Sequence, residues 1–423
     1  MRGVLYAANA LIRIIKICIF ASFVLFCPQF FLLYSSRYYE QYRVVDKAFK
    51  LGIENIGTVD KKIFTVPGTQ SRVALITNQA GVDQQGRYTS DLLSQAHINI
   101  KKIIIPTICS KKKQLQTDAV STLPIPVEYL YGFAYTCKKD LFKECDLILF
   151  DVPDISLAYD QYIAVIKDIL AIVMRSKKPL VVLDRPNLVS SKIEGVLGKR
   201  SDMLLPLRSG MSGAELIQYI NKKLFSSQAE LRIVPMSQYN RLSNEQKELL
   251  DYLMRMKLPA CMSAMHSFVG ILSQVQPFDI GIGTDHAFEC LLLPESLSFE
   301  RQKWYELQIN LRNNGIESKF YRYFNSAKKE YYHGLQFNMH TLKDYSMVNS
   351  LLSVLMFFKQ NGLALHFSTD FDAAIGTPLI REVVLGIKSY KQLQEKLNTD
   401  VRAFFEQAQD AFMYTPFPEL LFV

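Results

Sequence analysis

The sequence predicts an α/β protein in which a Rossmann-like, doubly wound parallel sheet is followed by a second, smaller α/β or α+β domain and preceded by an N-terminal transmembrane helix. Short runs that are apolar throughout alternate with helical patterns, which is typical of parallel strands covered on both faces. The chain has 423 residues, enough for two domains at roughly 100 to 200 residues each. The stretch from Ile17 to Tyr34 is almost uninterruptedly apolar and has about the length that crosses a bilayer.

The first domain is predicted from elements that alternate between Arg72 and Met236. Continuous apolar runs indicate strands, and apolar residues at helical spacing indicate helices. The expected strands are Arg72–Asn78, Lys101–Thr107, Asp146–Asp151, Leu180–Asp184 and Leu231–Met236, and the expected helices are Thr89–His97, Gln161–Arg175 and Ala214–Phe225. Ligands of such sheets bind in the loops beyond the carboxyl ends of the strands.

A boundary between the two domains is expected where the alternation stops. Asn240–Met256 has the pattern of a charged amphipathic helix, and Leu258–Gly270 is interpreted as an irregular connection. The second domain is then expected to contain helices Phe299–Asn314 and Ser346–Gln360, strands Lys319–Phe324 and His333–His340, and a helical tail around Val401–Phe412. The predicted organisation is a membrane anchor or signal segment over residues 1–40, a Rossmann-like domain over 41–257 and a smaller domain over 258–423.

The N-terminal segment is predicted to be an uncleaved, single-pass membrane anchor. Arg2, Arg13 and Lys16 precede the apolar stretch, and the positive-inside rule then places the body outside the cytoplasm, on the periplasmic or cell-wall side. A cleaved signal peptide is the alternative. Large residues such as Leu33 and Tyr34 follow the apolar core where a cleavage site has small ones, which favours the anchor.

The net charge bears on the class of partner, and the spacing of the cysteines bears on disulfide bonding. The formal net charge of +9 is spread along the chain, and no zinc-knuckle spacing or arginine-rich arm accompanies it, so we expect no nucleic-acid partner and favour an anionic membrane or cell-wall polymer. Outside the apolar segment the cysteines are isolated: Cys109, Cys137, Cys145, Cys261 and Cys290. They are interpreted as small buried hydrophobic residues, with a single Cys109–Cys137 disulfide as the alternative.

Polar residues follow the expected strands and are the first candidates for a site. Asp151 and Asp154 follow the third strand; they are either a general acid and base or, alternatively, caps of the following helix. Asp184 and Arg185 follow the fourth strand and either face a ligand or form a buried ion pair that locks the loop.

Further candidates have a structural alternative. Asn78 is interpreted first as a turn residue and second as a contact to a sugar hydroxyl. His286 is interpreted as a surface histidine; the alternative is that it acts as a general acid in the site. His333 and His340 are seven residues apart on an expected strand, which places them on opposite faces, so no metal site is expected. The Gly281–Gly283 segment does not open a helix after the first strand, so no nucleotide cofactor is expected.

An ordered series of short segments carries a resemblance to a known family. It comprises Leu75–Asn78, Gly81–Asp83, Phe150–Val152 with Asp154, Leu183–Asn187, Glu194–Gly195, Gly210–Ser212, Glu215–Leu216, Val234–Met236, Gly283–Thr284, Phe288–Glu289, His333–Gln336 and Gly376–Thr377 with Arg381. In this order the segments resemble the NamZ-type exo-β-N-acetylmuramidases. The resemblance implies a Rossmann-like catalytic domain, a smaller C-terminal domain and hydrolysis of N-acetylmuramic acid from the non-reducing ends of peptidoglycan fragments. The substrate-binding residues that we expect from it are Asn78, Asp184, Arg185, Asn187, Thr284 and Glu289, with no cofactor.

The chain departs from this family at several site positions. The resemblance places a Pro-Glu-His-Gly signature, with the expected catalytic Glu and His, where this chain has Pro106, Thr107, Ile108 and Cys109. An arginine of the family falls on Ala158, and the two arginines around Gly283 are replaced by Ile282 and His286. Glycoside hydrolysis normally needs one carboxylic acid to protonate the leaving oxygen and a second group that activates water or attacks the sugar.

Two hypotheses follow. The chain is a membrane-tethered glycosidase in which Asp151, Asp154 or Asp184 takes over the acid role, or it is a catalytically inactive relative that binds cell-wall glycan or a protein partner. An unrelated intracellular role is the third alternative.

Overall fold

The computed structural model describes residues 49–107, 119–131, 141–153, 162–187, 192–200, 202–241, 264–338 and 345–415. The predicted anchor lies outside the described residues, as does the predicted boundary between 257 and 258. In the ranges given above, no helix combines the length and the apolar character that crossing a membrane requires.

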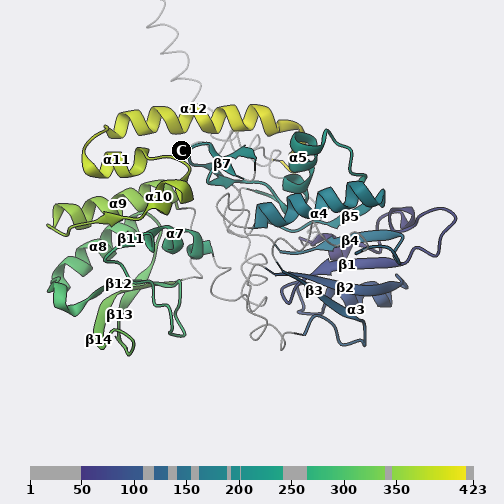
Figure 1. The fold of residues 1–423 in the computed structure, drawn as a ribbon, viewed down its shortest axis with the longest axis horizontal. Helices are drawn as coiled ribbons and strands as arrows, with labels where there is room; N and C mark the ends of the chain where they lie inside the picture. Colours follow the sequence, from purple (N-terminus) through teal and green to yellow (C-terminus); the bar gives the residue numbers. More distant parts are fainter. Residues whose placement is uncertain are drawn as a thin grey trace, which may run out of the picture. The chain divides into compact units, whose positions relative to one another are not determined.

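A six-stranded parallel sheet organises the first part of the chain (Figure 1). Its order is β10-β5-β4-β1-β2-β3, and every neighbouring pair is parallel. The strands are β1 (Val73–Thr77), β2 (Ile100–Thr107), β3 (Val127–Tyr131), β4 (Leu147–Asp151), β5 (Leu180–Leu183) and β10 (Leu231–Val234). The chain winds outward from β1 in one direction and then, from β4, in the other, so the strand order reverses between β1 and β4. This arrangement confirms the predicted parallel α/β fold.

Both faces of the sheet are covered, which explains why the strands read as continuous apolar runs. Val73 and Leu75 of β1 join the same buried cluster as Leu93 of α3 (Thr89–Gln95), whereas Ala74 and Ile76 join the cluster of the opposite face. Alternate side chains of a strand point to opposite faces. The second cluster includes α4 (Tyr162–Ser176) and α5 (Gly213–Phe225).

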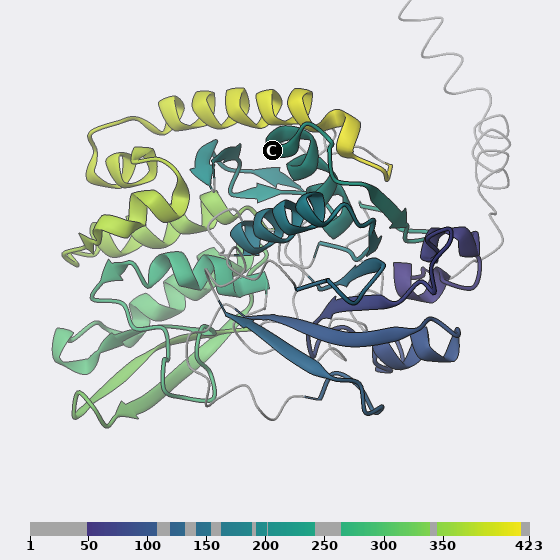
Figure 2. The same cartoon turned by 45° about the vertical axis from the view of Figure 1, so that its right-hand side comes forward.

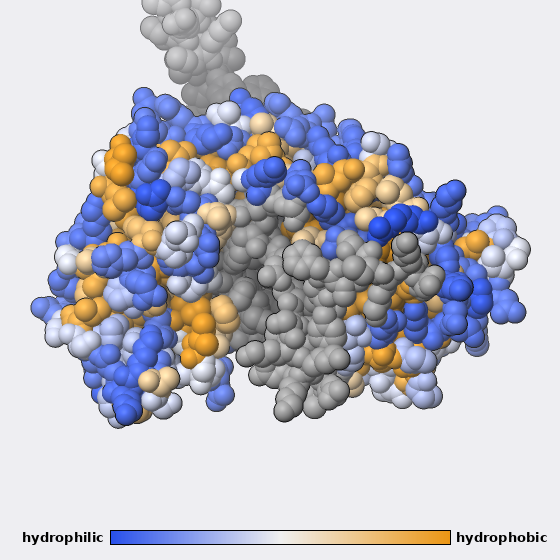
Figure 3. All heavy atoms as spheres, viewed as in Figure 1, coloured by the Kyte–Doolittle hydropathy of each residue, from blue (hydrophilic) through white to orange (hydrophobic). Residues whose placement is uncertain are grey.

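The C-terminal helix α12 (Tyr390–Ala408) returns to the first part of the chain. Val401 and Phe404 belong to the cluster of α4 and α5, and both ribbon views show α12 on that side of the sheet (Figure 2). The sequence predicted a helical tail only from about Val401, whereas α12 begins at Tyr390. The first turns of α12 were missed because they are mostly polar. Hydrophilic residues cover α12 in the space-filling view (Figure 3), and Lys391 and Glu395 are exposed.

The second part of the chain is built on a three-stranded antiparallel sheet of order β12-β14-β13. Its strands are β12 (Cys290–Pro294), β13 (Ser318–Asn325) and β14 (Glu330–Phe337), and its helices are α7 (Ala264–Leu272), α8 (Arg301–Asn313), α9 (Met347–Gln360), α10 (Thr369–Ile375) and α11 (Leu379–Leu385). Leu291 and Leu335 pack in one cluster with Trp304 of α8 and Phe358 of α9.

Short elements complete the described fold. Two small antiparallel pairs, β6 (Ile193–Glu194) with β9 (Arg208–Ser209) and β7 (Gly198–Arg200) with β8 (Met203–Leu205), precede α5. A third pair is β11 (Val275–Gln276) with β15 (His366–Phe367). The 3-10 turns are η1 (Gly52–Asn55), η2 (Lys61–Phe64), η5 (Glu295–Leu297) and η6 (Gln409–Ala411).

Several predicted bounds are wrong. The connection expected over Leu258–Gly270 contains the start of helix α7 at Ala264. The strand expected at His333–His340 begins earlier, at Glu330, because alternating polar and aromatic residues extend the pairing with β13. The predicted helix Asn240–Met256 lies almost entirely outside the described residues.

Candidate functional site

A buried ion pair lies at the carboxyl end of β4, where the strand order reverses. The Asp151 carboxylate is fully buried and receives Arg185 Nε at 2.5 Å and Arg185 Nη2 at 2.7 Å. The Thr89 hydroxyl donates to the same carboxylate, and Arg185 Nη1 donates to the Val82 carbonyl at 2.8 Å. Arg185 thereby ties the ends of β4 and β5 to the segment between β1 and α3.

This geometry bears directly on the acid role expected of Asp151. A general acid must present a proton to the leaving oxygen, within hydrogen-bond reach of the substrate. Both Asp151 oxygens instead accept hydrogen bonds from Arg185, and the side chain has no exposed surface. Asp151 does not cap a helix in this arrangement either; it fixes a buried guanidinium. Asp154, its predicted partner, lies outside the described residues.

Asn78 forms the turn after β1. Its side-chain oxygen accepts the Ala80 amide at 3.0 Å, and its carbonyl accepts the Gly81 amide at 2.9 Å. A Cβ atom at Gly81 would lie 2.1 Å from the Thr77 hydroxyl, so this turn requires glycine. Because Asn78 is also buried, the turn role that the sequence favoured describes its contacts.

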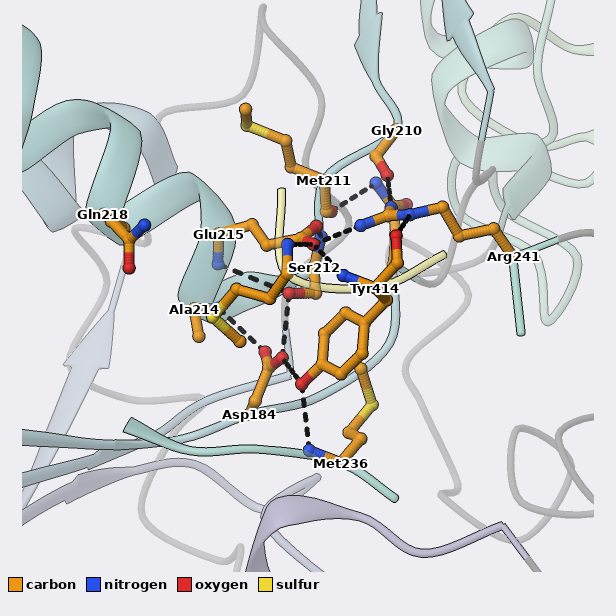
Figure 4. Close-up of polar contacts among 12 residues, drawn as sticks. Asp184, Gly210, Met211, Ser212, Ala214, Glu215, Gln218, Met236, Arg241 and Tyr414 are labelled. Carbon is orange, nitrogen blue, oxygen red and sulfur yellow. Dashed lines mark hydrogen bonds and ion pairs between the residues drawn. The ribbon is translucent and has the colours of Figure 1, made fainter. Parts of the chain in front are cut away.

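Asp184 lies at the start of α5, and not in a pair with its neighbour Arg185 (Figure 4). Its Oδ1 accepts the Ala214 amide at 2.8 Å, and its Oδ2 accepts the Ser212 hydroxyl at 2.9 Å and the Tyr414 hydroxyl at 2.5 Å. Burial raises the pKa of Asp184 to about 6, while the hydrogen bond from Tyr414 acts in the opposite direction. The nearby Asn187 is also buried and donates to the Met211 carbonyl at 3.0 Å.

A second buried ion pair joins α5 to the C-terminal segment (Figure 4). Glu215 lies in the first turn of α5, where a capping box forms with Ser212. Its Oε1 pairs with Arg241 and accepts the Met413 amide at 2.6 Å. The Arg241 guanidinium also lies 5.0 Å from the centre of the Phe412 ring. The Glu215 and Arg241 side chains have no exposed surface, so they hold the C-terminal segment against the sheet.

A third ion pair, between Glu194 and Arg208, joins the small β6·β9 pair to α9. The Glu194 carboxylate accepts the Ser346 hydroxyl at 2.6 Å and the Val348 amide at 2.9 Å, which places a negative charge at the positive end of the α9 dipole. Arg208 Nη1 donates to Glu194 at 3.1 Å and to the Tyr345 carbonyl at 3.0 Å. A small pocket beside this ion pair is lined by Lys192, Ile193, Glu194, Gly195, Ser346, Val348, Asn349, Gln394, Leu397, Asn398 and Val401.

Thr284 and Glu289 lie in the loop that leads into β12. The Thr284 hydroxyl donates to the Gly281 carbonyl at 2.8 Å and accepts the His286 amide at 3.0 Å, so it shapes the turn. Glu289 Oε2 lies 2.9 Å from His286 Nδ1 and accepts Gln336 Nε2 at 3.1 Å. Unlike Asp151, Asp184 and Arg185, the Glu289 and His286 side chains are partly exposed.

The structure places the described candidate site residues in four settings. Asn78 lies in the turn after β1, and Asp151 pairs with Arg185. Asp184 and Asn187 lie near the start of α5, whereas Thr284 and Glu289 lie before β12. Sequence reasoning missed Tyr414 and Arg241, which reach the site from distant segments and carry no local signal. It also missed the contact of Gln336 with Glu289, because only the pairing of β12 with β14 brings the two residues together.

The ranges that the structure covers contain no group of three or more His, Cys, Asp or Glu side chains that could hold a metal ion. Cys145 and Cys290 are unpaired and buried, as predicted for small hydrophobic residues. The alternative Cys109–Cys137 disulfide lies outside the described residues.

Comparisons with known proteins give the same relationship for both parts of the chain. Residues 73–270 match the family described as exo-beta-N-acetylmuramidase NamZ, N-terminal, and residues 266–414 match its C-terminal counterpart. The peptidoglycan beta-N-acetylmuramidase NamZ of Bacillus subtilis is 25% identical over 302 residues, which are 67% of this chain and 72% of that protein. Two crystal structures of DUF1343 family proteins from Bacteroides fragilis share the fold: each match covers 87% of this chain and 99% of the other, with TM-scores of 0.67 and 0.59 at 22% and 16% identity.

Proposed function

Because the chain belongs to the family of the exo-β-N-acetylmuramidase NamZ, we propose that it acts on N-acetylmuramic acid at the ends of peptidoglycan fragments. The observation that carries this proposal is the match to both family parts in order, over residues 73–270 and 266–414. It confirms the resemblance drawn from the short sequence segments. The Bacillus subtilis relative is described as a peptidoglycan beta-N-acetylmuramidase, which supports the same substrate class for this chain.

A catalytically inactive relative that binds the same sugar or a protein partner is the second candidate. It is favoured by Thr107 and Ile108, which stand where the resemblance places the catalytic Glu and His. It is also favoured by the burial of Asp151, Asp184 and Arg185: Asp151 pairs with Arg185, and Asp184 accepts from Ser212 and Ala214.

Turnover of a chromogenic N-acetylmuramide by the full chain tests both candidates, with the Bacillus subtilis relative as positive control. We expect release of the chromophore with saturation kinetics. Saturable sugar binding without release would support the inactive binding module. Neither release nor binding, under conditions in which the control is active, would contradict the enzyme and the sugar-binding relative and leave only the relative that binds a protein partner.

We further propose that the N-terminal segment tethers the protein to the cell membrane with its body outside the cytoplasm. The apolar stretch from Ile17 to Tyr34 and the basic residues before it support this proposal. Mass analysis of the membrane-extracted protein should then find Met1 to Tyr34 intact. A mature amino terminus near Arg37 would show instead that the segment is a cleaved signal peptide.

A further inference from the structure

His286, Glu289 and Gln336 form a polar cluster at one end of the three-stranded sheet. Glu289 immediately precedes β12, and Gln336 pairs with Cys290 in the β12–β14 register. The Gln336 amide nitrogen lies 2.8 Å from His286 Nδ1 and 3.1 Å from Glu289 Oε2. His286 Nδ1 lies 2.9 Å from Glu289 Oε2. Three polar atoms from the loop and from β14 therefore meet within hydrogen-bond distance.

The proton on His286 Nδ1 decides how these contacts are made. With a proton on Nδ1, the imidazole donates to the Glu289 carboxylate, as a carboxylate commonly orients a histidine by accepting from one ring nitrogen. Gln336 Nε2 then donates to Glu289 Oε2 and no longer to Nδ1. Without that proton, Nδ1 can only accept from Gln336, and its lone pair then faces Glu289 Oε2. The contacts with Glu289 and Gln336 thus orient the ring with Nδ1 toward the cluster and Nε2 away from it.

The outward side of the cluster is available to a ligand. His286 Nε2 has no hydrogen-bond partner in the described part of the chain, and its side chain is 37% exposed. Gln336 is buried behind the ring, and its Oε1 atom has no hydrogen-bond partner. The edge of the His286 ring meets the Tyr321 ring at 5.2 Å between centres, and Tyr321 stacks on Tyr323.

We propose that His286 donates the proton to the leaving sugar oxygen, with Glu289 as its positioning residue, and that this pair supplies the acid that the chain lacks after β2. The inference rests on the proposed function. As the bond between the anomeric carbon and the glycosidic oxygen breaks, its electron pair stays on the oxygen, which takes the proton from His286 Nε2. Water forms the new bond to the anomeric carbon and releases one proton to solvent, from which His286 is protonated again.

Few other charged or titratable groups face this imidazole. Glu289 lies on its own loop, Asp285 is its chain neighbour, and Tyr321 approaches from β13. Lys319 of β13 lies opposite Gln336 in the strand register. Asp279 instead accepts from Tyr323 and pairs with Lys328. The Glu289 carboxylate is therefore the negative group in direct contact with the ring.

Two substrates distinguish an acid from a structural residue. For the full chain, His286→Gln should lower kcat on a muramic acid disaccharide by about 10²- to 10⁴-fold, the usual contribution of a general acid. The loss should be much smaller on an aryl muramide, whose leaving group departs without protonation. Glu289→Gln should retain more activity on the disaccharide than His286→Gln, because Glu289 orients the ring and does not itself donate the proton.

His366→Gln is the matched control, because His366 is an exposed histidine of β15 outside the cluster. It should leave both activities unchanged. Equal losses of His286→Gln on both substrates, or no loss, would overturn the acid role while leaving the proposed function standing. Sugar binding by the wild type without turnover would also overturn it. Absence of both binding and turnover would count against the proposed function itself.

Proton NMR gives a readout that does not depend on substrate. At mildly acidic pH, the wild type should show a downfield imidazole N–H resonance from the hydrogen bond to Glu289. The resonance should disappear in His286→Gln and in Glu289→Gln and remain in His366→Gln. Its persistence in Glu289→Gln would contradict the pairing of His286 with Glu289, whatever the activity of the protein.

Discussion

Asp151→Asn should lower the free energy of unfolding by about 3 to 5 kcal/mol, because it leaves the Arg185 guanidinium buried without a counter-charge. The substitution preserves the size of the side chain, so the loss reports charge and hydrogen bonding and not a cavity. Arg185 is 2% exposed and Asp151 is 0% exposed, which excludes compensation by solvent. Equilibrium urea unfolding of the full chain, followed by circular dichroism, measures the change.

Arg72→Gln is the matched control for this prediction. Arg72 pairs with Asp146 at the amino ends of β1 and β4, but its side chain is 38% exposed, so its loss should cost much less than the loss of the buried pair. Replacing both partners, Asp151→Asn with Arg185→Met, should restore part of the stability. Equal, small losses for Asp151→Asn and Arg72→Gln would refute the structural role of the buried pair.

The same prediction affects how loss of activity is interpreted. A variant that unfolds loses turnover whether or not the residue takes part in catalysis. Activity of Asp151→Asn must therefore be measured per folded molecule. Full activity of the folded fraction would exclude Asp151 as the acid.

Glu215→Ala should also be strongly destabilising, by about 3 to 5 kcal/mol, since it leaves the Arg241 guanidinium buried without its counter-charge. It additionally removes the acceptor of the Met413 amide, which lies 2.6 Å from Glu215 Oε1. The C-terminal segment should then detach first. Hydrogen exchange followed by mass spectrometry should show faster exchange in peptides that cover residues 409–415, together with a lower urea midpoint.

Lys222→Ala is the control on the same helix. Lys222 pairs with Asp410, yet both side chains are largely exposed, so its effect should stay below about 1 kcal/mol. Unchanged exchange of the C-terminal peptides in Glu215→Ala would show that the buried pair does not hold this segment.

Local patterns predicted the central sheet because strands that are buried on both faces appear in the sequence as continuous apolar runs. The runs Val73–Thr77 and Leu147–Asp151 are buried at every position, and such strands are apolar throughout. Apolar residues at helical spacing likewise predicted the helix Ala214–Phe225, which the structure shows as α5 (Gly213–Phe225). The edge strand β3 escaped prediction since Val127 is exposed and the strand has no continuous apolar run.

The hydrogen-bond and ion-pair partners of the buried polar side chains could not be predicted from the sequence. Asp184 and Arg185 are neighbours and suggested an ion pair, but successive side chains at the end of a strand point to opposite faces. Asp184 therefore turns to Ser212 and Tyr414, while Arg185 turns to Asp151. Predicting either contact requires the order of the strands, which no local pattern contains.

The sequence by itself determined the α/β class, most elements of the sheet and the family, since these follow from local periodicity and from an ordered series of short segments. Only the tertiary structure decided which polar residues are buried in ion pairs and which remain open to a ligand. Asp151 and Arg185 became structural because the sheet brings two strand ends together, whereas His286 meets Glu289 and Gln336 because β14 pairs with β12. Burial and pairing are properties of distant segments packed together, so they cannot be read from any one of them.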